Sequence, residues 1–180
     1  MRGKLQTKRI DAPESPLRYA IFSTGQGWLG LLASGKGLLA ATLPQTSKEA
    51  ALERLGEDIE KAAPDDGFFS DIVSRLREYF SGHPVSFEDE IDAGEVTPFQ
   101  LKVWQTARTI PYGETRSYAW LARQIGKPAA PRAVGQALKR NRLPVIIPCH
   151  RVIASDGDIG GFSGGPAAKK RLLKLETTSP

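Results

Sequence analysis

Short apolar segments separated by glycine-containing turns dominate the early part of the chain. The segments are 18–24, 28–33 and 38–43, with turns at 25–27 and 34–37. Apolar runs of this length between glycines are typical of an antiparallel meander. Apolar side chains at helical spacing follow and predict helices over 47–63 and 68–80. Together these segments indicate a small antiparallel sheet with helices packed on it.

A second series of helices is predicted from residue 97 onward. Thr97 is a suitable N-cap and Pro98 suits the first helical position, and Pro111-Tyr112-Gly113 ends the element. Ser117 can cap a helix over 118–125, and a third helix is expected over 131–139. Two short helices joined by a glycine-containing turn are typical of a helix-turn-helix unit.

One side of the helix over 131–139 consists of Ala133, Gly135 and Ala137. Side chains this small let the helix backbone approach another surface closely, and close packing against another helix would also explain them. The sequence leaves these two interpretations open.

The last part of the chain combines a glycine-rich segment with a basic helix. Residues 156–165 lack the Gly-Lys-Ser/Thr ending of a phosphate-binding loop and the dinucleotide spacing, which favours a wing or a pocket wall. A helix is predicted over 167–176, with Leu172, Leu173 and Leu175 as its buried stripe.

The pattern predicts an α+β fold with two domains. The first is a small N-terminal antiparallel sheet with helices, over 17–92, after a loose arm over 1–16. The second is a mostly helical domain with a winged helix-turn-helix-like unit, over 93–176, before a tail over 177–180. Each domain is long enough to form its own packed layers.

Composition narrows the class of protein. A chain of 180 residues with 40% hydrophobic content can bury a core. The single cysteine excludes an internal disulfide and a multi-cysteine zinc site, and His83 has no second ligand nearby, so we expect no metal and no cofactor. The polar residues 1–16 lack the apolar core of a secretory signal, and no apolar stretch is long enough to span a bilayer. We therefore expect a soluble cytoplasmic protein that does not bind a membrane.

Charge is distributed unevenly along the chain, whose net charge is +5. Residues 98–180 contain 14 Lys and Arg against 4 Asp and Glu, a net charge of +10, and residues 1–97 carry a net charge of −5. This asymmetry suggests a polyanionic partner for the basic half. A solvated basic surface without a partner would explain it equally well.

The only cysteine, Cys149, is the main candidate for chemistry. The apolar run 145–147, which predicts a strand, and Pro148 precede it, and His150 and Arg151 follow it. The thiolate is the reactive form of cysteine, and a neighbouring base or cation raises its population at neutral pH. A lone cysteine is more often a small buried hydrophobic residue, but these neighbours favour a nucleophile.

The cysteine belongs to one of four motifs in the second half of the chain, Pro148-Cys149-His150-Arg151-Val152. The other three are Pro111-Tyr112-Gly113-Glu114 with Ser117-Tyr118, Arg132-Ala133-Val134-Gly135-Gln136-Ala137 with Asn141, and Gly160-Gly161-Phe162-Ser163-Gly164-Gly165 with Lys169, Leu172, Leu173 and Glu176. In order and spacing these motifs resemble those of the O6-alkylguanine-DNA alkyltransferase family, and the first resembles its active-site signature. The resemblance is strong over 98–176 and covers 18–97 in general shape. It makes 93–176 the expected DNA-binding and alkyl-transfer domain.

The resemblance implies a reaction that consumes the protein. Cys149 would attack the alkyl carbon on O6 of a damaged guanine, or on O4 of thymine, in double-stranded DNA. The product would be a thioether, so each molecule would act once. We expect a monomer in solution, and the sequence does not decide whether copies associate along DNA.

The resemblance also implies roles for residues around Cys149. His150 matches a base that acts through a water, with Glu176 behind it, in the manner of a catalytic triad. Asn141 matches an asparagine that braces the turn carrying the cysteine. Tyr118 matches a tyrosine whose hydroxyl can protonate N3 of the leaving guanine.

Substrate-binding residues follow from the same motifs. The backbone N–H of Ser163 would meet O6, and the carbonyls of Cys149 and Val152 would accept from the exocyclic amine. Leu138 and Phe162 would set the pocket size. Arg132 would fill the gap left by the flipped nucleotide, while Ala133 and Gly135 would let the helix enter the narrow minor groove.

Two residues depart from the family pattern. Many relatives have proline after the asparagine, whereas this chain has Arg142, which would either loosen the turn or add a phosphate contact. Phe162 stands where tyrosine is common.

Three other classes of protein stay open from the residues alone. They are a lesion sensor of similar fold, a cysteine hydrolase and a winged-helix regulator with an inert cysteine.

Overall fold

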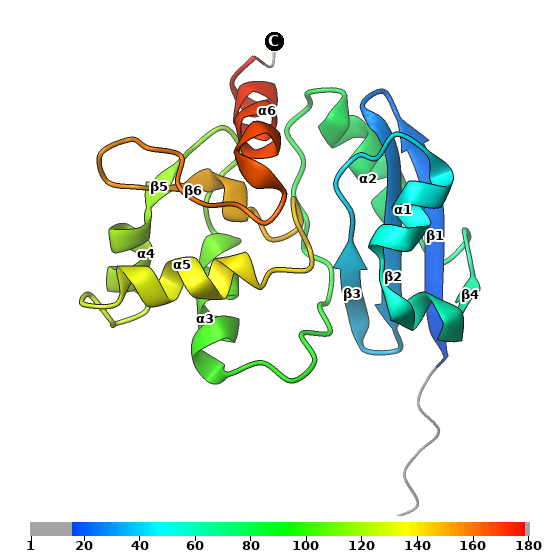
Figure 1. Ribbon diagram of the computed structural model, residues 1–180, viewed down its shortest axis with the longest axis horizontal. Helices are drawn as coiled ribbons and strands as arrows, with labels where there is room; N and C mark the ends of the chain where they lie inside the picture. The colour runs from blue at the N-terminus through cyan, green and yellow to red at the C-terminus, as the bar shows by residue number, and fades with distance from the viewer. Residues whose placement is uncertain (1–15, 179–180) are drawn as a thin grey trace, which may run out of the picture.

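The computed structural model describes residues 16–178, in which a four-stranded sheet is followed by a mostly helical half (Figure 1). The expected arm over 1–16, apart from Pro16, and residues 179–180 of the expected tail lie outside this range. The sheet has the order β3-β2-β1-β4. Its strands are β1 (Leu17–Thr24), β2 (Gly27–Ser34), β3 (Gly37–Ala41) and β4 (Ala62–Pro64). Antiparallel pairing of β1 with β2 and of β2 with β3 confirms the predicted meander.

The fourth strand makes the sheet mixed, so the expectation of a purely antiparallel sheet is wrong. β4 pairs in parallel with β1, with Leu17 opposite Ala62. The single helix predicted over 47–63 is also wrong. It divides into α1 (Lys48–Arg54), the 3-10 helix η1 (Glu57–Lys61) and β4. Gly56 separates them with φ of 88°, a left-handed value that glycine adopts without strain and that stops an α-helix.

Both faces of the sheet are covered by helices, with α1 in front of the strands and α2 (Ser70–Phe80) behind them in Figure 1. Leu32 and Leu55 belong to the core under α1. Leu31 and Ala33 belong instead to the larger core, which contains α2 and continues into the second half. Alternate residues of β2 therefore serve two cores, because successive side chains of a strand point to opposite faces.

The second half contains the predicted helices close to their expected bounds. They are α3 (Pro98–Ala107), α4 (Tyr118–Gln124), α5 (Pro131–Lys139) and α6 (Gly165–Thr177). Between them lie β5 (Arg116–Ser117), the 3-10 helix η2 (Cys149–Arg151) and β6 (Val152–Ile153), and β5 pairs with β6 in parallel. A reciprocal capping box between Thr97 and Gln100 starts α3, which stabilises the first turn by satisfying its free N–H groups.

Helix α5 packs across α3 and α4. The indole Nε1 of Trp104 donates a 2.9 Å hydrogen bond to the carbonyl of Ala137. Ala137 is buried, while Ala133 is exposed and Gly135 half-buried. The small residues of α5 therefore serve two purposes, since Ala137 permits helix packing and Ala133 leaves a bare outer surface.

Two further predictions are wrong. The run 145–147 is buried as expected, but it forms a turn and not a strand, with Val145 at a φ of 75°. The buried stripe of α6 is Ala168, Lys169, Leu172 and Glu176, whereas Leu173 and Leu175 are only half-buried. The observed stripe repeats every three or four residues, as one helix face requires.

Within residues 16–178, no helix is long and apolar enough to cross a membrane.

Candidate active site

Cys149 lies at the start of η2, buried between the helices of the second half, with 4% of its surface exposed. The side chain of Asn141 donates through Nδ2 to Sγ of Cys149 at 3.1 Å and to the carbonyl of Ile147 at 3.0 Å. Its Oδ1 accepts from the N–H of Leu143 at 2.8 Å. One amide therefore holds both ends of the turn and the sulfur that follows it.

This turn explains why no strand forms before the cysteine. The N–H of Ile147 donates to the carbonyl of Leu143 at 2.8 Å, closing the chain on itself around Val145. A positive φ is strained for a β-branched residue and persists only where the surroundings enforce it. Here the hydrogen bonds of Asn141 and the burial of residues 143–147 enforce it.

His150 and Glu176 form a buried pair next to the thiol. Nε2 of His150 lies 2.7 Å from Oε1 of Glu176, and both side chains are almost completely buried. Burial raises the pKa of Glu176, but hydrogen bonds from His150 and Arg151 outweigh it and bring the pKa to about 2. Burial lowers the pKa of His150. The pair is therefore a carboxylate accepting from a neutral imidazole.

The hydrogen-bond network fixes the tautomer of that imidazole. Because an ionised Glu176 can only accept, Nε2 carries the proton and Nδ1 carries a lone pair. Among the buried side-chain nitrogens and oxygens of residues 16–178, only Nδ1 of His150 has no hydrogen-bond partner. A buried acceptor of this kind, one residue from the thiol, is available to take a proton.

Arg151 does not serve the thiol as its place in the sequence suggested. Its Nε lies 2.9 Å from Oε2 of Glu176, and its Nη1 donates to the carbonyl of Ile110 at 2.7 Å. The guanidinium therefore neutralises the carboxylate and fixes it against the loop after α3.

Tyr79 of α2 completes the surroundings of Glu176. Its hydroxyl donates to Oε1 of Glu176 at 2.7 Å and lies 3.3 Å from Nε2 of His150. Tyr79 lies on the helix predicted over 68–80 and is buried in the core, and its contact with Glu176 was not predicted from the sequence. The only signal was the hydroxyl itself, because a buried tyrosine usually requires a partner.

Lys169 of α6 is a cation that lowers the pKa of the Cys149 thiol. Burial raises the pKa of Cys149 to about 11, while the hydrogen bond from Asn141 and the charge of Lys169 act in the opposite direction. Lys169 is completely buried, and its Nζ donates to the carbonyl of Val152 at 2.6 Å. Burial lowers the pKa of Lys169 to about 8. Lys169 belongs to the last of the four motifs, and the resemblance implied no role for it.

Tyr118 begins α4 and faces the glycine-rich loop. Its hydroxyl donates to the carbonyl of Gly161 at 3.4 Å, and Nζ of Lys169 lies 5.7 Å from the centre of its ring. A Cβ on Gly135 would meet the same ring at 3.7 Å, so α5 passes directly beside Tyr118. Burial raises the pKa of Tyr118, which keeps its hydroxyl protonated.

The expected substrate-binding residues are distributed over three segments. Leu138 and Val152 are buried, Phe162 is half-buried and Ser163 is exposed on the loop before α6. Arg132 and Ala133 are exposed on the first turn of α5. The structure therefore pairs Asn141 with Cys149 and His150 with Glu176 in one buried region and leaves Arg132 and Ala133 on the surface.

A buried thiol is held by an amide and lies beside a neutral imidazole that has an unpaired nitrogen. Such a site suits a cysteine that accepts a transferred group, and it lies in the half of the chain that contains the helix-turn-helix unit. Two family models match this chain. Residues 17–93 match the ribonuclease-like domain of 6-O-methylguanine DNA methyltransferase, and residues 98–178 match the DNA-binding domain of the same family.

Individual relatives agree with the family models. A methylated-DNA–protein-cysteine methyltransferase of Mycobacterium leprae is 42% identical over 146 residues, which cover 81% of this chain and 85% of the relative. One of Methanosarcina acetivorans is 39% identical over 88% of this chain and 97% of the relative. The crystal structure of Mycobacterium tuberculosis OGT in complex with DNA has a TM-score of 0.75 and 41% identity, covering 91% of this chain and 95% of that one.

The chain belongs to the O6-methylguanine DNA methyltransferase family. Its α+β architecture, with a sheet-and-helix half followed by a helical DNA-binding half, is the architecture of that family.

Proposed function

We propose that this chain repairs DNA by moving an alkyl group from O6 of guanine to Sγ of Cys149. Its activity is that of a methylated-DNA–protein-cysteine methyltransferase, in agreement with its relatives. In the reaction the bond from sulfur to the alkyl carbon forms while the bond from that carbon to O6 breaks. The thioether is not reversed by thiol exchange, so each molecule reacts once.

The single observation that carries the residue assignment is the contact between Nδ2 of Asn141 and Sγ of Cys149, at 3.1 Å. An N–H donor aimed at sulfur favours the thiolate over the thiol, which is the form that attacks carbon. The same amide fixes the turn, so the sulfur is oriented and activated by one residue. Cys149 is thus the nucleophile, and Asn141 is a positioning residue.

His150 is the base of the proposed reaction. Its Nδ1 takes the thiol proton, directly or through one water, and the carboxylate of Glu176 stabilises the imidazolium that results. Tyr118 supplies a proton to N3 of the departing guanine. The thiol proton replaces the one that Tyr118 gives up, so guanine leaves as a neutral base and the tyrosine is regenerated.

We propose that double-stranded DNA containing O6-alkylguanine binds along α5. The exposed Arg132 and Ala133 lie on its first turn, and Gly135 lies next to the ring of Tyr118. Small side chains suit a narrow minor groove, and Arg132 would occupy the space left when the target nucleotide flips out of the stack. Ser163, Phe162, Leu138 and the carbonyl of Val152 would line the site for the flipped base. The carbonyl of Val152 keeps a second lone pair for the guanine amine.

The two halves divide the work in this proposal. Residues 93–176 bind DNA and carry the acceptor thiol, and residues 17–92 support them, with Tyr79 holding Glu176. The protein acts as a monomer and requires no cofactor.

Intact mass spectrometry tests the assignment. After incubation with a duplex containing one O6-methylguanine, the wild-type protein should gain one methyl group, located on the peptide with Cys149. Cys149→Ala and Cys149→Ser should bind the duplex and gain nothing. A methyl adduct on either variant would overturn the assignment. Binding without transfer by the wild-type protein would indicate a lesion sensor, and hydrolysis of a thioester without transfer would indicate a cysteine hydrolase.

A further inference from the structure

A hollow of about 570 Å³ lies between the two halves of the molecule and borders the active site. Asn141, Pro144, Ser163 and Gly164 form its wall on the side of the second half. Residues 40–45, at the end of β3 and just beyond it, form the opposite wall. The two walls are in tight contact, because a Cβ on Gly164 would collide with the side chain of Leu43.

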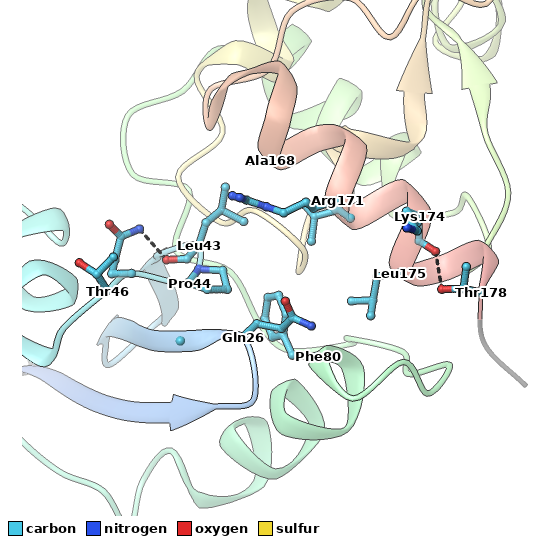
Figure 2. A pocket seen from close by; sticks show the side chains of 13 residues that line it. Gln26, Leu43, Pro44, Thr46, Phe80, Ala168, Arg171, Lys174, Leu175 and Thr178 are labelled. Atoms are coloured by element: carbon cyan, nitrogen blue, oxygen red, sulfur yellow. Dashed lines mark hydrogen bonds between the residues drawn. The ribbon is translucent and has the colours of Figure 1, made fainter.

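Three guanidinium groups from separate elements line this hollow. Arg54 is the last residue of α1, Arg142 follows α5 and Arg171 lies on α6. All three are exposed, and no carboxylate is among the residues that line the hollow. Figure 2 draws a neighbouring pocket that shares Leu43, Pro44 and Arg171 with this hollow, and it shows the side chain of Arg171 reaching from α6 toward Leu43 and Pro44 of the facing half. We refer to this space, with these three arginines, as the arginine hollow.

One acidic residue lies next to the arginine hollow. Asp58 of η1 is 3.4 Å from Nη2 of Arg142, and both side chains are about half exposed. A long and exposed ion pair of this kind contributes little. No ion pair within residues 16–178 involves Arg54 or Arg171. The arginine hollow therefore keeps a positive potential.

The position of Asn141 relates the arginine hollow to the reacting atoms. Asn141 touches Sγ of Cys149 at 3.1 Å and also lines the hollow, so one side chain separates the two. During transfer the alkyl carbon lies between Sγ and O6, with the proposed O6 contact at Ser163, which lines the hollow as well. A substituent longer than methyl has to extend away from the line joining sulfur, carbon and oxygen. Asn141, Pro144, Ser163 and Gly164 line the arginine hollow on the side of the active site, so a substituent that extends past them would enter it.

We infer that this chain accepts O6-substituents that end in an anionic group, such as a carboxylate, in preference to cationic ones of the same size. The inference rests on the proposed function. The arginines act at the far end of the substituent and leave the reacting carbon to Cys149. Arg142 belongs to this selectivity because it replaces the neutral proline expected after Asn141.

Free guanine derivatives provide the cleanest test, because they carry no phosphates of their own. Three probes of similar size differ mainly in the charge of the group at the para position: O6-(4-carboxybenzyl)guanine, O6-(4-methylbenzyl)guanine and O6-(4-aminomethylbenzyl)guanine. Single-turnover rates of adduct formation on the full chain should rank carboxylate above methyl above ammonium. An exposed ion pair contributes up to about fivefold, so we expect a difference on the order of fivefold between carboxylate and ammonium. The difference should shrink as salt is added, because mobile ions screen exposed charges.

Charge-removing variants locate the effect. Arg54→Gln, Arg142→Gln and Arg171→Gln should each reduce the ratio of the carboxylate rate to the ammonium rate, and the triple variant should bring it close to one. Lys170→Gln is the matched control, since Lys170 is exposed on the same helix and does not line the hollow. It should leave the ratio unchanged.

The outcomes separate this inference from the proposed function. Equal rates for the three probes, a preference for ammonium, or an unchanged ratio in the triple variant would overturn the charge preference and leave methyl transfer intact. Reaction with O6-methylguanine DNA but with none of the benzyl probes would show that the hollow is closed to substituents, which also overturns it. Failure to form any adduct on Cys149, from the methylated duplex included, would overturn the proposed function itself.

Discussion

The hydroxyl of Tyr79 donates a 2.7 Å hydrogen bond to Oε1 of Glu176. The two residues are 97 residues apart in the sequence, in α2 and in the last turn of α6. Glu176 also accepts from His150, from Arg151 and from the N–H of Gly113. A carboxylate with this many donors is held in one position, and the imidazole that it orients is held with it. The first half of the chain therefore takes part in organising the site.

Tyr79→Phe removes one of these donors and leaves the ring in place. We expect the variant to transfer alkyl groups about tenfold more slowly from both duplex and free base, because an outer hydrogen bond to a catalytic group is typically worth that much or more. DNA affinity should not change, since Tyr79 is completely buried and its hydroxyl contacts Glu176 and His150. Single-turnover rates and binding titrations measure the two effects. Tyr19→Phe, on the sheet outside this network, should react at the wild-type rate, and an undiminished rate in Tyr79→Phe would contradict the role of its hydroxyl.

The titration of Cys149 gives a second prediction. Burial holds the pKa of the thiol at about 11 even though Lys169 lowers it, so the rate with free O6-benzylguanine should rise with pH through the neutral range. Lys169→Met removes a positive charge, which raises the thiol pKa further and reduces the thiolate fraction at any given pH. We expect about a tenfold slower rate near neutral pH, as for loss of one nearby opposite charge.

Lys169→Arg is the control for that experiment, because it keeps a positive charge at the same position. It should retain more of the rate than Lys169→Met, although the larger guanidinium must still fit beside the carbonyl of Val152. If the two variants and the wild type showed the same dependence of rate on pH, electrostatic support of the thiolate by Lys169 would be wrong.

Acid stability gives a third prediction, in which Glu176 is the titrating group. Its pKa falls from 4.5 to about 2 in the folded protein, so the unfolded chain binds more protons between these values. The stabilisation is therefore fully present above pH 4.5 and is lost as the pH falls toward 2. Urea unfolding at several pH values should show a steeper loss for the wild type than for Glu176→Gln, which cannot titrate. Parallel curves for the two proteins would show that Glu176 does not carry this linkage.

Local sequence patterns were sufficient to predict the helices of the second half. The bounds of α5 agree with the prediction over 131–139 because Pro131 can begin a helix and the segment after Lys139 cannot continue it. The motifs around Cys149 likewise pointed to Asn141, His150 and Glu176, and in the structure Asn141 bonds to Cys149 and His150 to Glu176. These assignments needed no knowledge of long-range contacts beyond the resemblance to a family.

Other features depend on contacts that no local pattern contains. The run 145–147 has the composition of a strand, yet the side chain of Asn141 takes up the backbone groups that a strand would need. Tyr79 fits an apolar helix face, and its role follows only from a partner 97 residues away. Arg151 is adjacent to the thiol in sequence but turns to Glu176, because a buried carboxylate attracts the nearest guanidinium.

Arg132→Ala is predicted to slow repair of duplex DNA far more than transfer from free O6-benzylguanine. Arg132 is exposed on the first turn of α5 and has no part in the network around Cys149, so it should act only by stabilising the flipped nucleotide. Unstacking a base costs a few kcal/mol, and a free base does not incur this cost. Glu176→Gln should slow both substrates, because it weakens the base that activates the thiol. Single-turnover rates for the two variants on the two substrates make the comparison. If Arg132→Ala slowed the free base as much as the duplex, Arg132 would be shaping the pocket, and its role in base flipping would be wrong.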